Sequence, residues 1–128
     1  MATWPEVKSF IKSNYEIQSE TELTMTMVFE TGGGRSQLVY VMGIEGADLL
    51  SSVRFFSPFA EVSQISANQF AGLADGVLFG LARLADFYGV VHNSFLADLD
   101  ASEINTPLIA VTSQADKMEK QLGLGDNL

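Results

Sequence analysis

Apolar residues change their spacing several times along the chain, and each spacing predicts a different element. In "TWPEVKSFIKSN", residues 3–14, apolar side chains recur every three or four positions, as on one side of a helix. Thr3 and Glu6 have the spacing of a capping box, and Pro5 fits a first helical turn, where its missing N–H is not needed. We therefore predict a first helix over residues 3–14.

Strict two-residue alternation follows and predicts antiparallel strands. In "LTMTMVF", residues 23–29, Leu, Met and Phe lie on one side and Thr and Val on the other. "QLVYVMGI", residues 37–44, alternates in the same way, and the two valines on its second side indicate a more central strand. "LLSSVRFF", residues 49–56, is a weaker third strand that Pro58 closes.

Gly32–Gly34 connect the first two strands and allow two interpretations. A phosphate-binding loop needs its glycines between a strand and a helix N-terminus, with a lysine close behind. Here a strand follows, and the next residue is Arg35. Glycines accept the positive φ angles of a tight hairpin, so we predict a hairpin tip. Because hairpin tips are exposed, replacing Arg35 and Ser36 by alanine is expected to cost little stability.

The longest predicted helix begins at Ser66, which has capping-box spacing with Gln69. From Phe70 to Ala85 the apolar residues follow a 3.6-residue period, and the helix is expected to end near Gly89. "VVHNSFLADL", residues 90–99, is then expected to form a fourth strand.

A final helix is predicted from Thr106, as N-cap, and Pro107, as first helical residue, to Gly123. Residues 124–128 are expected to be frayed. The expected order is therefore α-β-β-β-α-β-α. Strands grouped before a long helix predict an α+β fold, with an antiparallel sheet packed against a long helix, as one domain over residues 1–128.

The composition is that of a folded domain with its own core. Hydrophobic residues make up 47% of the 128 residues, and the absence of cysteine excludes disulfides and thiolate chemistry. No stretch approaches the about 20 apolar residues that span a bilayer, and "MATWPEVKSF" lacks the features of a signal peptide. We therefore expect a cytoplasmic location.

The charge narrows the class of partner. Sixteen acidic residues and seven Lys and Arg give a formal net charge of −9. Nucleic acids and anionic membranes select a basic face, whereas the cations of this chain are scattered along it. We expect neither nucleic acid nor membrane as a partner, and another polypeptide as a better one. The charge by itself also serves to keep an apolar-rich chain in solution.

Residues that commonly carry chemistry form no motif here. His92 is the single histidine and stands beside no activating motif. Asp98, Asp100 and Glu103 resemble the start of a calcium loop, but the glycine and glutamate required at its sixth and twelfth positions are missing. We predict no catalytic residues, no metal site and no cofactor, and hence a protein that is not an enzyme.

Three glycines give the predicted long helix an unusual edge. Gly72, Gly76 and Gly80 recur every four residues, and Phe79 points away from the apolar side. Glycine inside a helix costs about 1 kcal/mol relative to alanine, so three of them suggest close approach by another element. That element belongs either to the same chain or to a second subunit. The four residues are therefore a candidate dimer interface.

The layout as a whole resembles a known fold. The segments that carry the resemblance are "WPEVKSFIKSNYEI", "TMTMVFETGGGRSQLVYV", "FAGLADGVLFGLARLADFYG" and "ADKMEKQL". Together they are similar to the type III secretion chaperone-like fold and, within it, to the YbjN-like bacterial family. The resemblance implies a non-enzymatic protein, often a homodimer, that binds other polypeptides or acts in regulation.

Two functions remain open at this point. The first is a protein-interaction module, a small acidic chaperone-like or regulatory adaptor that forms a homodimer and binds another polypeptide. The alternative is a small-molecule-binding or enzymatic α+β domain with an apolar pocket under the long helix. In that case Tyr40, Tyr88 and His92 are the expected polar groups of the pocket.

Overall fold

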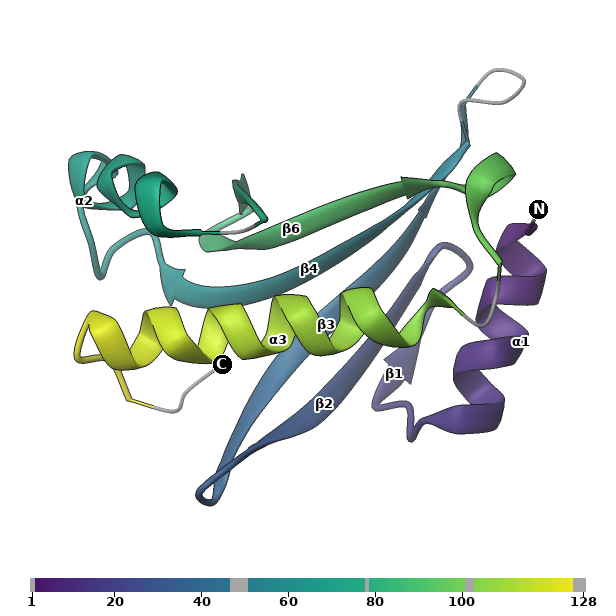
Figure 1. The fold of residues 1–128 in the computed structure, drawn as a ribbon, viewed down its shortest axis with the longest axis horizontal. Coiled ribbons are helices and arrows are strands. Elements are labelled where there is room, and N and C mark those ends of the chain that lie inside the picture. The colour runs from purple at the N-terminus through teal and green to yellow at the C-terminus, as the bar shows by residue number, and fades with distance from the viewer. Residues whose placement is uncertain (1, 47–50, 78, 101–102, 126–128) are drawn as a thin grey trace.

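The computed structural model describes residues 2–46, 51–77, 79–100 and 103–125 and shows an α+β fold (Figure 1). The elements in chain order are α1 (Trp4–Asn14), β1 (Ser19–Glu20), β2 (Thr24–Gly32), β3 (Arg35–Ile44), β4 (Ser52–Glu61), α2 (Ala67–Gly72), the 3-10 helix η2 (Leu73–Gly76), β5 (Gly80–Leu84), β6 (Phe87–Phe95), the 3-10 helix η3 (Leu96–Asp98) and α3 (Asn105–Gln121).

The strands form one six-stranded antiparallel sheet in the order β1-β2-β3-β4-β6-β5. Met25 pairs with Val41, and Val41 pairs with Phe55. Phe55 in turn pairs with His92. Because successive residues of a strand point to opposite faces, this row belongs to one face of the sheet. We call it the covered face.

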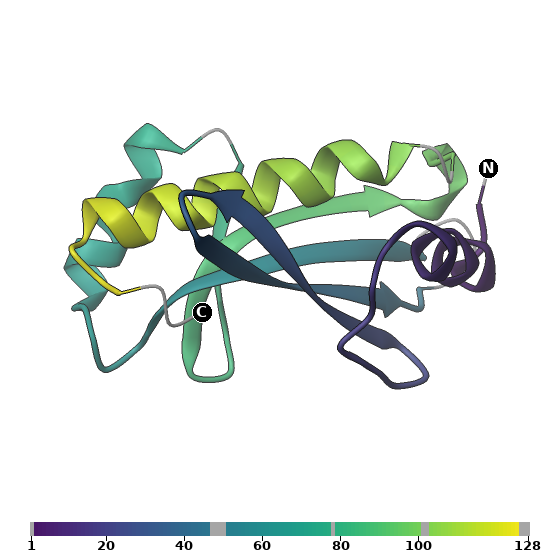
Figure 2. The same ribbon diagram turned by 90° about the horizontal axis from the view of Figure 1, so that it is seen from below.

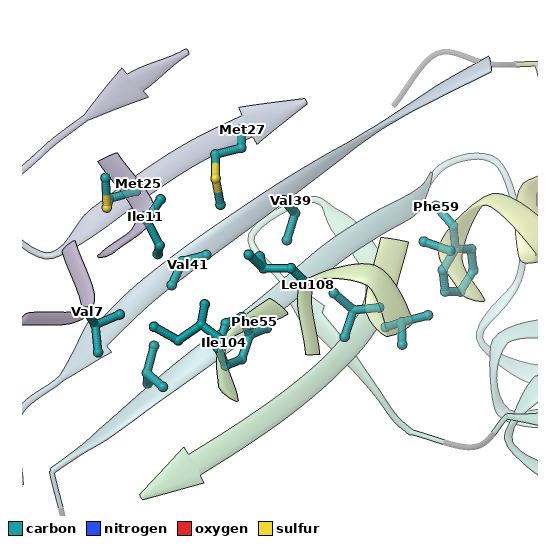
Figure 3. Packing of buried hydrophobic residues seen from close by; sticks show 14 of the residues in the cluster. Val7, Ile11, Met25, Met27, Val39, Val41, Phe55, Phe59, Ile104 and Leu108 are labelled. Atoms are coloured by element: carbon teal, nitrogen blue, oxygen red, sulfur yellow. The ribbon is translucent and has the colours of Figure 1, made fainter. Parts of the chain in front are cut away.

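Helix α3 lies along the covered face and contacts β2, β3, β4 and β6 (Figures 1 and 2). Ile104, the N-cap residue of α3, and Leu108 on α3 are fully buried, as are Val39, Val41 and Phe55 on the strands below (Figure 3). These side chains form the centre of the core. Fully burying each such side chain contributes about 1.5–3 kcal/mol, so the docking of α3 is a main source of stability.

Helix α1 extends the core at one end of the covered face. Thr3 accepts a hydrogen bond from the Glu6 backbone N–H, which confirms the predicted cap. Val7 is fully buried on its inner side. The Trp4 ring lies against Gly43, where an added Cβ would approach the indole to 2.6 Å. Only glycine leaves room for the ring at that position.

Helix α2 joins the covered face at the other end of the sheet. The Phe70 ring stacks on Tyr88 with 4.1 Å between ring centroids and lies 6.4 Å from the ring of Phe59. Through Trp4, Phe70 and α3, the three helices therefore contact the same face of the sheet.

The predicted α+β class and the antiparallel sheet under a long helix are confirmed. The order α-β-β-β-α-β-α also holds, with the short strands β1 and β5 added. The hairpin between β2 and β3 is confirmed as well: Gly32, Gly33 and Gly34 all have positive φ. The final helix begins one residue before the predicted N-cap, and Gly123 ends it with a φ of 71°.

The predicted long helix over residues 66–89 is wrong. The capping box of Ser66 and Gln69 is present, but α2 ends at Gly72 and η2 at Gly76. The chain then forms the β5–β6 hairpin. Each helical glycine costs about 1 kcal/mol, whereas the β-branched and aromatic residues of β6 gain a full ladder with β4. The long helix that packs on the sheet is α3.

Some predictions fall outside the described residues. The third strand was expected to begin at residue 49, and residues 49–50 are outside the described residues. The corresponding strand of the structure, β4, runs from Ser52 to Glu61. Residues 126–128 of the segment expected to be frayed are likewise outside the described residues.

Candidate interaction surface

The four residues proposed as a dimer interface do not share a helix. Gly72 ends α2, Gly76 ends η2, and Gly80 begins β5. The stripe of small residues that motivated the interface therefore does not exist. Phe79 does not point away from the core either: its ring meets the His92 ring edge-on at 5.4 Å and packs against the core cluster.

A Gly76→Leu variant is expected to keep its stability within about 0.5 kcal/mol of the wild-type chain. A Cβ at Gly76 would meet nothing within 4 Å, so the added side chain overpacks nothing that the structure describes. Urea denaturation would check this. A loss of several kcal/mol would show that residues 73–80 pack more tightly than the structure indicates.

The residues expected around a small-molecule pocket do not converge. Tyr40 points to the face of the sheet opposite α3, since it follows Val39 and precedes Val41 on β3. Tyr88 and His92 lie on the covered face, where Tyr88 stacks on Phe70 and His92 lies 3.1 Å from the Ser94 hydroxyl. These three side chains therefore line no common site.

The carboxylates considered for calcium are separated in the same way. Asp98 ends η3, and the Asp100 carbonyl accepts a hydrogen bond from the Glu103 N–H. Within the described ranges, no three His, Cys, Asp or Glu side chains are placed to hold a metal ion. No helix in that part of the chain is long and apolar enough to cross a membrane.

Arg35 is not a free residue of the hairpin tip, contrary to the prediction. Its Nε donates to the Asp116 carboxylate of α3 at 2.7 Å, across 81 positions of sequence. Asp116 is 4% exposed, and Lys120 approaches its other oxygen at 3.3 Å. The pair ties the β2–β3 hairpin to the C-terminal half of α3, so replacing Arg35 by alanine is expected to be costly.

We call the face of the sheet away from α3 the open face (Figure 2). Alternation along the paired strands places there the side chains that point opposite to the core. Its apolar residues are Val28 of β2, Leu38, Tyr40, Met42 and Ile44 of β3, Phe56 and Pro58 of β4, and Phe87, Val91 and Phe95 of β6.

Exposure differs along the open face. Val28, midway along β2, and Phe95, at the end of β6, are 47% and 52% exposed. Phe56, at the centre, is only 2% exposed because its ring lies over Gly89, which has no side chain. Tyr40 lies beside it, with 6.5 Å between ring centroids. The centre of the open face is thus a packed aromatic platform with apolar residues around it.

The charges of the open face are few and polarised. On these strands, alternation places there one cation, Arg54, and two anions, Glu30 and Glu61. Arg54 lies toward the end where β4 begins and donates to Asn93 at 2.9 Å. Glu30 and Glu61 lie at the opposite end, which we call the acidic end.

The alternation in the sequence identified which residues of β3 share a face, but not which face is open. It separated Leu38, Tyr40 and Met42 from Val39 and Val41 without showing which set the helices cover. Both sets are apolar, and α3 is distant in sequence, so only the three-dimensional arrangement distinguishes them. Val91 and Phe95 lie in the strand predicted over residues 90–99, but the sequence does not show that this strand pairs with β4, so their contribution was missed.

Comparison with known proteins does not assign the chain to a family. No family model matches the chain, and no curated protein matches it.

Proposed function

We propose that the protein is a non-enzymatic interaction module, a small acidic chaperone-like or regulatory adaptor that binds another polypeptide through the open face. The observation that carries this proposal is the continuous apolar surface on β2, β3, β4 and β6, opposite the helices. Monomeric proteins rarely expose contiguous apolar patches larger than a few hundred Å², and larger ones mark interaction sites.

The composition of the open face supports a polypeptide partner in particular. Tyr, Phe and Met are enriched at the centres of protein interfaces, and Lys is depleted. The open face has Tyr40, Met42 and Phe95, and its strands carry no lysine. Tyr40, Met42 and Phe95 offer apolar contact area, which suits burial under another chain.

We also propose a family, a cellular location and an oligomeric state for this module. A net charge of −9 and the order α-β-β-β-α-β-α support a YbjN-like protein with a type III secretion chaperone-like fold. Within this proposal the chain acts in the cytoplasm as a homodimer.

A photo-crosslinking residue at position 42 tests the proposal in the full chain inside cells. Met42 lies partly exposed in the apolar part of the open face, so we expect a crosslinked product that contains another polypeptide chain. The matched control carries the same residue at exposed Ser13 on the outer side of α1. Equal yields at the two positions would contradict a binding surface on the open face.

A second variant links the product to the apolar surface itself. Val28→Asp in the chain that carries the probe should reduce the crosslinked product severalfold. Val28 is 47% exposed, so the charge can remain in water in the unbound chain and the fold should persist. Circular dichroism checks that it does. An unchanged yield would show that the product does not depend on the open face.

A further inference from the structure

We propose that the polypeptide bound by the open face is a second copy of this chain, packed face to face about a two-fold axis. This inference rests on the proposed function, because it names the occupant of the same surface. Its support comes from the size of the open face, from its packed centre and from the arrangement of its charges.

The size of the open face fits a dimer of standard size. The four strands β2, β3, β4 and β6, spaced by about 4.8 Å, give a width of about 19 Å, and their nine or ten residues give a length of about 30 Å. The apolar part of the face therefore covers about 600 Å², and two copies would bury about 1,200 Å² together. Stable, specific interfaces bury about 1,200–2,000 Å² in total, so the estimate reaches the lower end of that range.

The centre of the open face is suited to contact with its own copy. The Phe56 ring is buried against Gly89, beside Tyr40, so the centre is already packed and presents few mobile side chains. A centre that is packed before binding loses little side-chain entropy on binding. Two sheets can pack with their inner faces about 10 Å apart and their strands within about 30° of each other.

The charges make the open face complementary to itself. In a two-fold arrangement the same patch serves on both subunits, so every contact occurs twice. An axis that crosses the strands near Phe56 places each strand antiparallel to its copy. Arg54 of each subunit then lies over the acidic end of the other, near Glu61 or Glu30. A partner with uniform charge would be repelled at one end of the same face.

Charge reversal tests this arrangement in the full-length chain. Arg54→Glu sets one added carboxylate against the two glutamates at the acidic end of its copy, and Glu30→Arg with Glu61→Arg sets two added cations against Arg54. Each variant should raise the Kd of the homodimer about tenfold or more, measured by sedimentation equilibrium. A mixture of the two variants should restore the dimer, because each cation again meets an anion.

The mixture also serves as the folding control, since misfolded chains would not recover on mixing. Dimers that persist in both separate variants, or a mixture that stays monomeric, would overturn the face-to-face arrangement. If the wild-type chain is monomeric at about 100 µM while the probe at position 42 captures a different polypeptide, the second-copy inference and the proposed homodimer are wrong, and the proposed binding of another polypeptide through the open face stands. If the probe captures no chain above its control, both are wrong.

Discussion

A Gly89→Val variant is expected to lose about 3 kcal/mol or more of its free energy of unfolding. A Cβ at Gly89 would lie 2.4 Å from Cζ of Phe56 and 2.6 Å from the carbonyl oxygen of Ser57. The Phe56 ring is 2% exposed and has little room to move, and the carbonyl belongs to the backbone of β4. Overpacking of this kind costs about 1–3 kcal/mol, and the branched side chain adds to it.

The measurement is thermal and urea denaturation beside the wild-type chain. A loss of about 3 kcal/mol should lower the Tm by roughly 10 °C in a domain of this size. The matched control is Gly72→Ala, because a Cβ at Gly72 meets nothing within 4 Å. As Gly72 is the last residue of α2, the alanine should leave stability unchanged or raise it by up to about 1 kcal/mol.

A second change identifies the cause of the loss. Phe56→Leu removes the ring that lies over position 89, so it should cost less stability in the Gly89→Val chain than in the wild-type chain. Equal costs in the two backgrounds would show that the ring is not responsible. The same pair of residues forms part of the packed centre of the open face, so the stability cycle also tests that packing.

The elements predicted well from the sequence are those whose pattern is decided locally. Residues 23–29 alternate strictly, and "GGG" at 32–34 demands positive φ, so the first hairpin needs no distant partner to be recognised. The same is true of α3, in which Leu108, Val111 and Ala115 are buried at helical spacing. In each case the tertiary structure reinforces the local preference.

The segment from residue 73 to residue 89 shows where such reasoning fails. Its apolar residues follow a helical period, but pairing decides the outcome: Leu81 pairs with Val90, and Val90 with Ser57. That ladder joins parts of the chain more than thirty positions apart. Ala85, at the turn of this hairpin, has a φ of 51°. Alanine rarely adopts a positive φ, so the sequence does not predict a turn at this residue. Sheet pairing overrode a local helical pattern weakened by its glycines.

The candidate surface was difficult to predict for a related reason. A strand that is apolar on both sides does not show which side the helices cover. The docking of α3 decides it, and one contact in that docking is the Arg35–Asp116 pair, which no local pattern reveals. The charges of the open face are likewise scattered in sequence, and only the sheet register brings Arg54 and the acidic end onto one face.

An Asp116→Ala variant is expected to lose about 3 kcal/mol of its free energy of unfolding at neutral pH. Removing one partner of a buried ion pair costs about 3–5 kcal/mol, because the other charge stays buried without compensation. The lower end of this range applies here, since the Arg35 side chain is 22% exposed and water can solvate it in part. Lys120 is 56% exposed, so Lys120→Met, the matched control, should cost less than about 1 kcal/mol.

The dependence of this loss on pH distinguishes the ion pair from a packing defect. Burial by itself raises the pKa of the Asp116 carboxyl, but the hydrogen bonds and charges of Arg35 and Lys120 outweigh it and hold the pKa below its ordinary value. The unfolded chain therefore binds a proton at pH values where the folded chain does not. The stabilisation is present above the ordinary pKa of aspartate and is lost as the pH falls through the folded-state value. Urea denaturation of wild type and Asp116→Ala across this range should show the difference between them shrinking in acid, whereas a difference that stays constant with pH would assign the loss to packing.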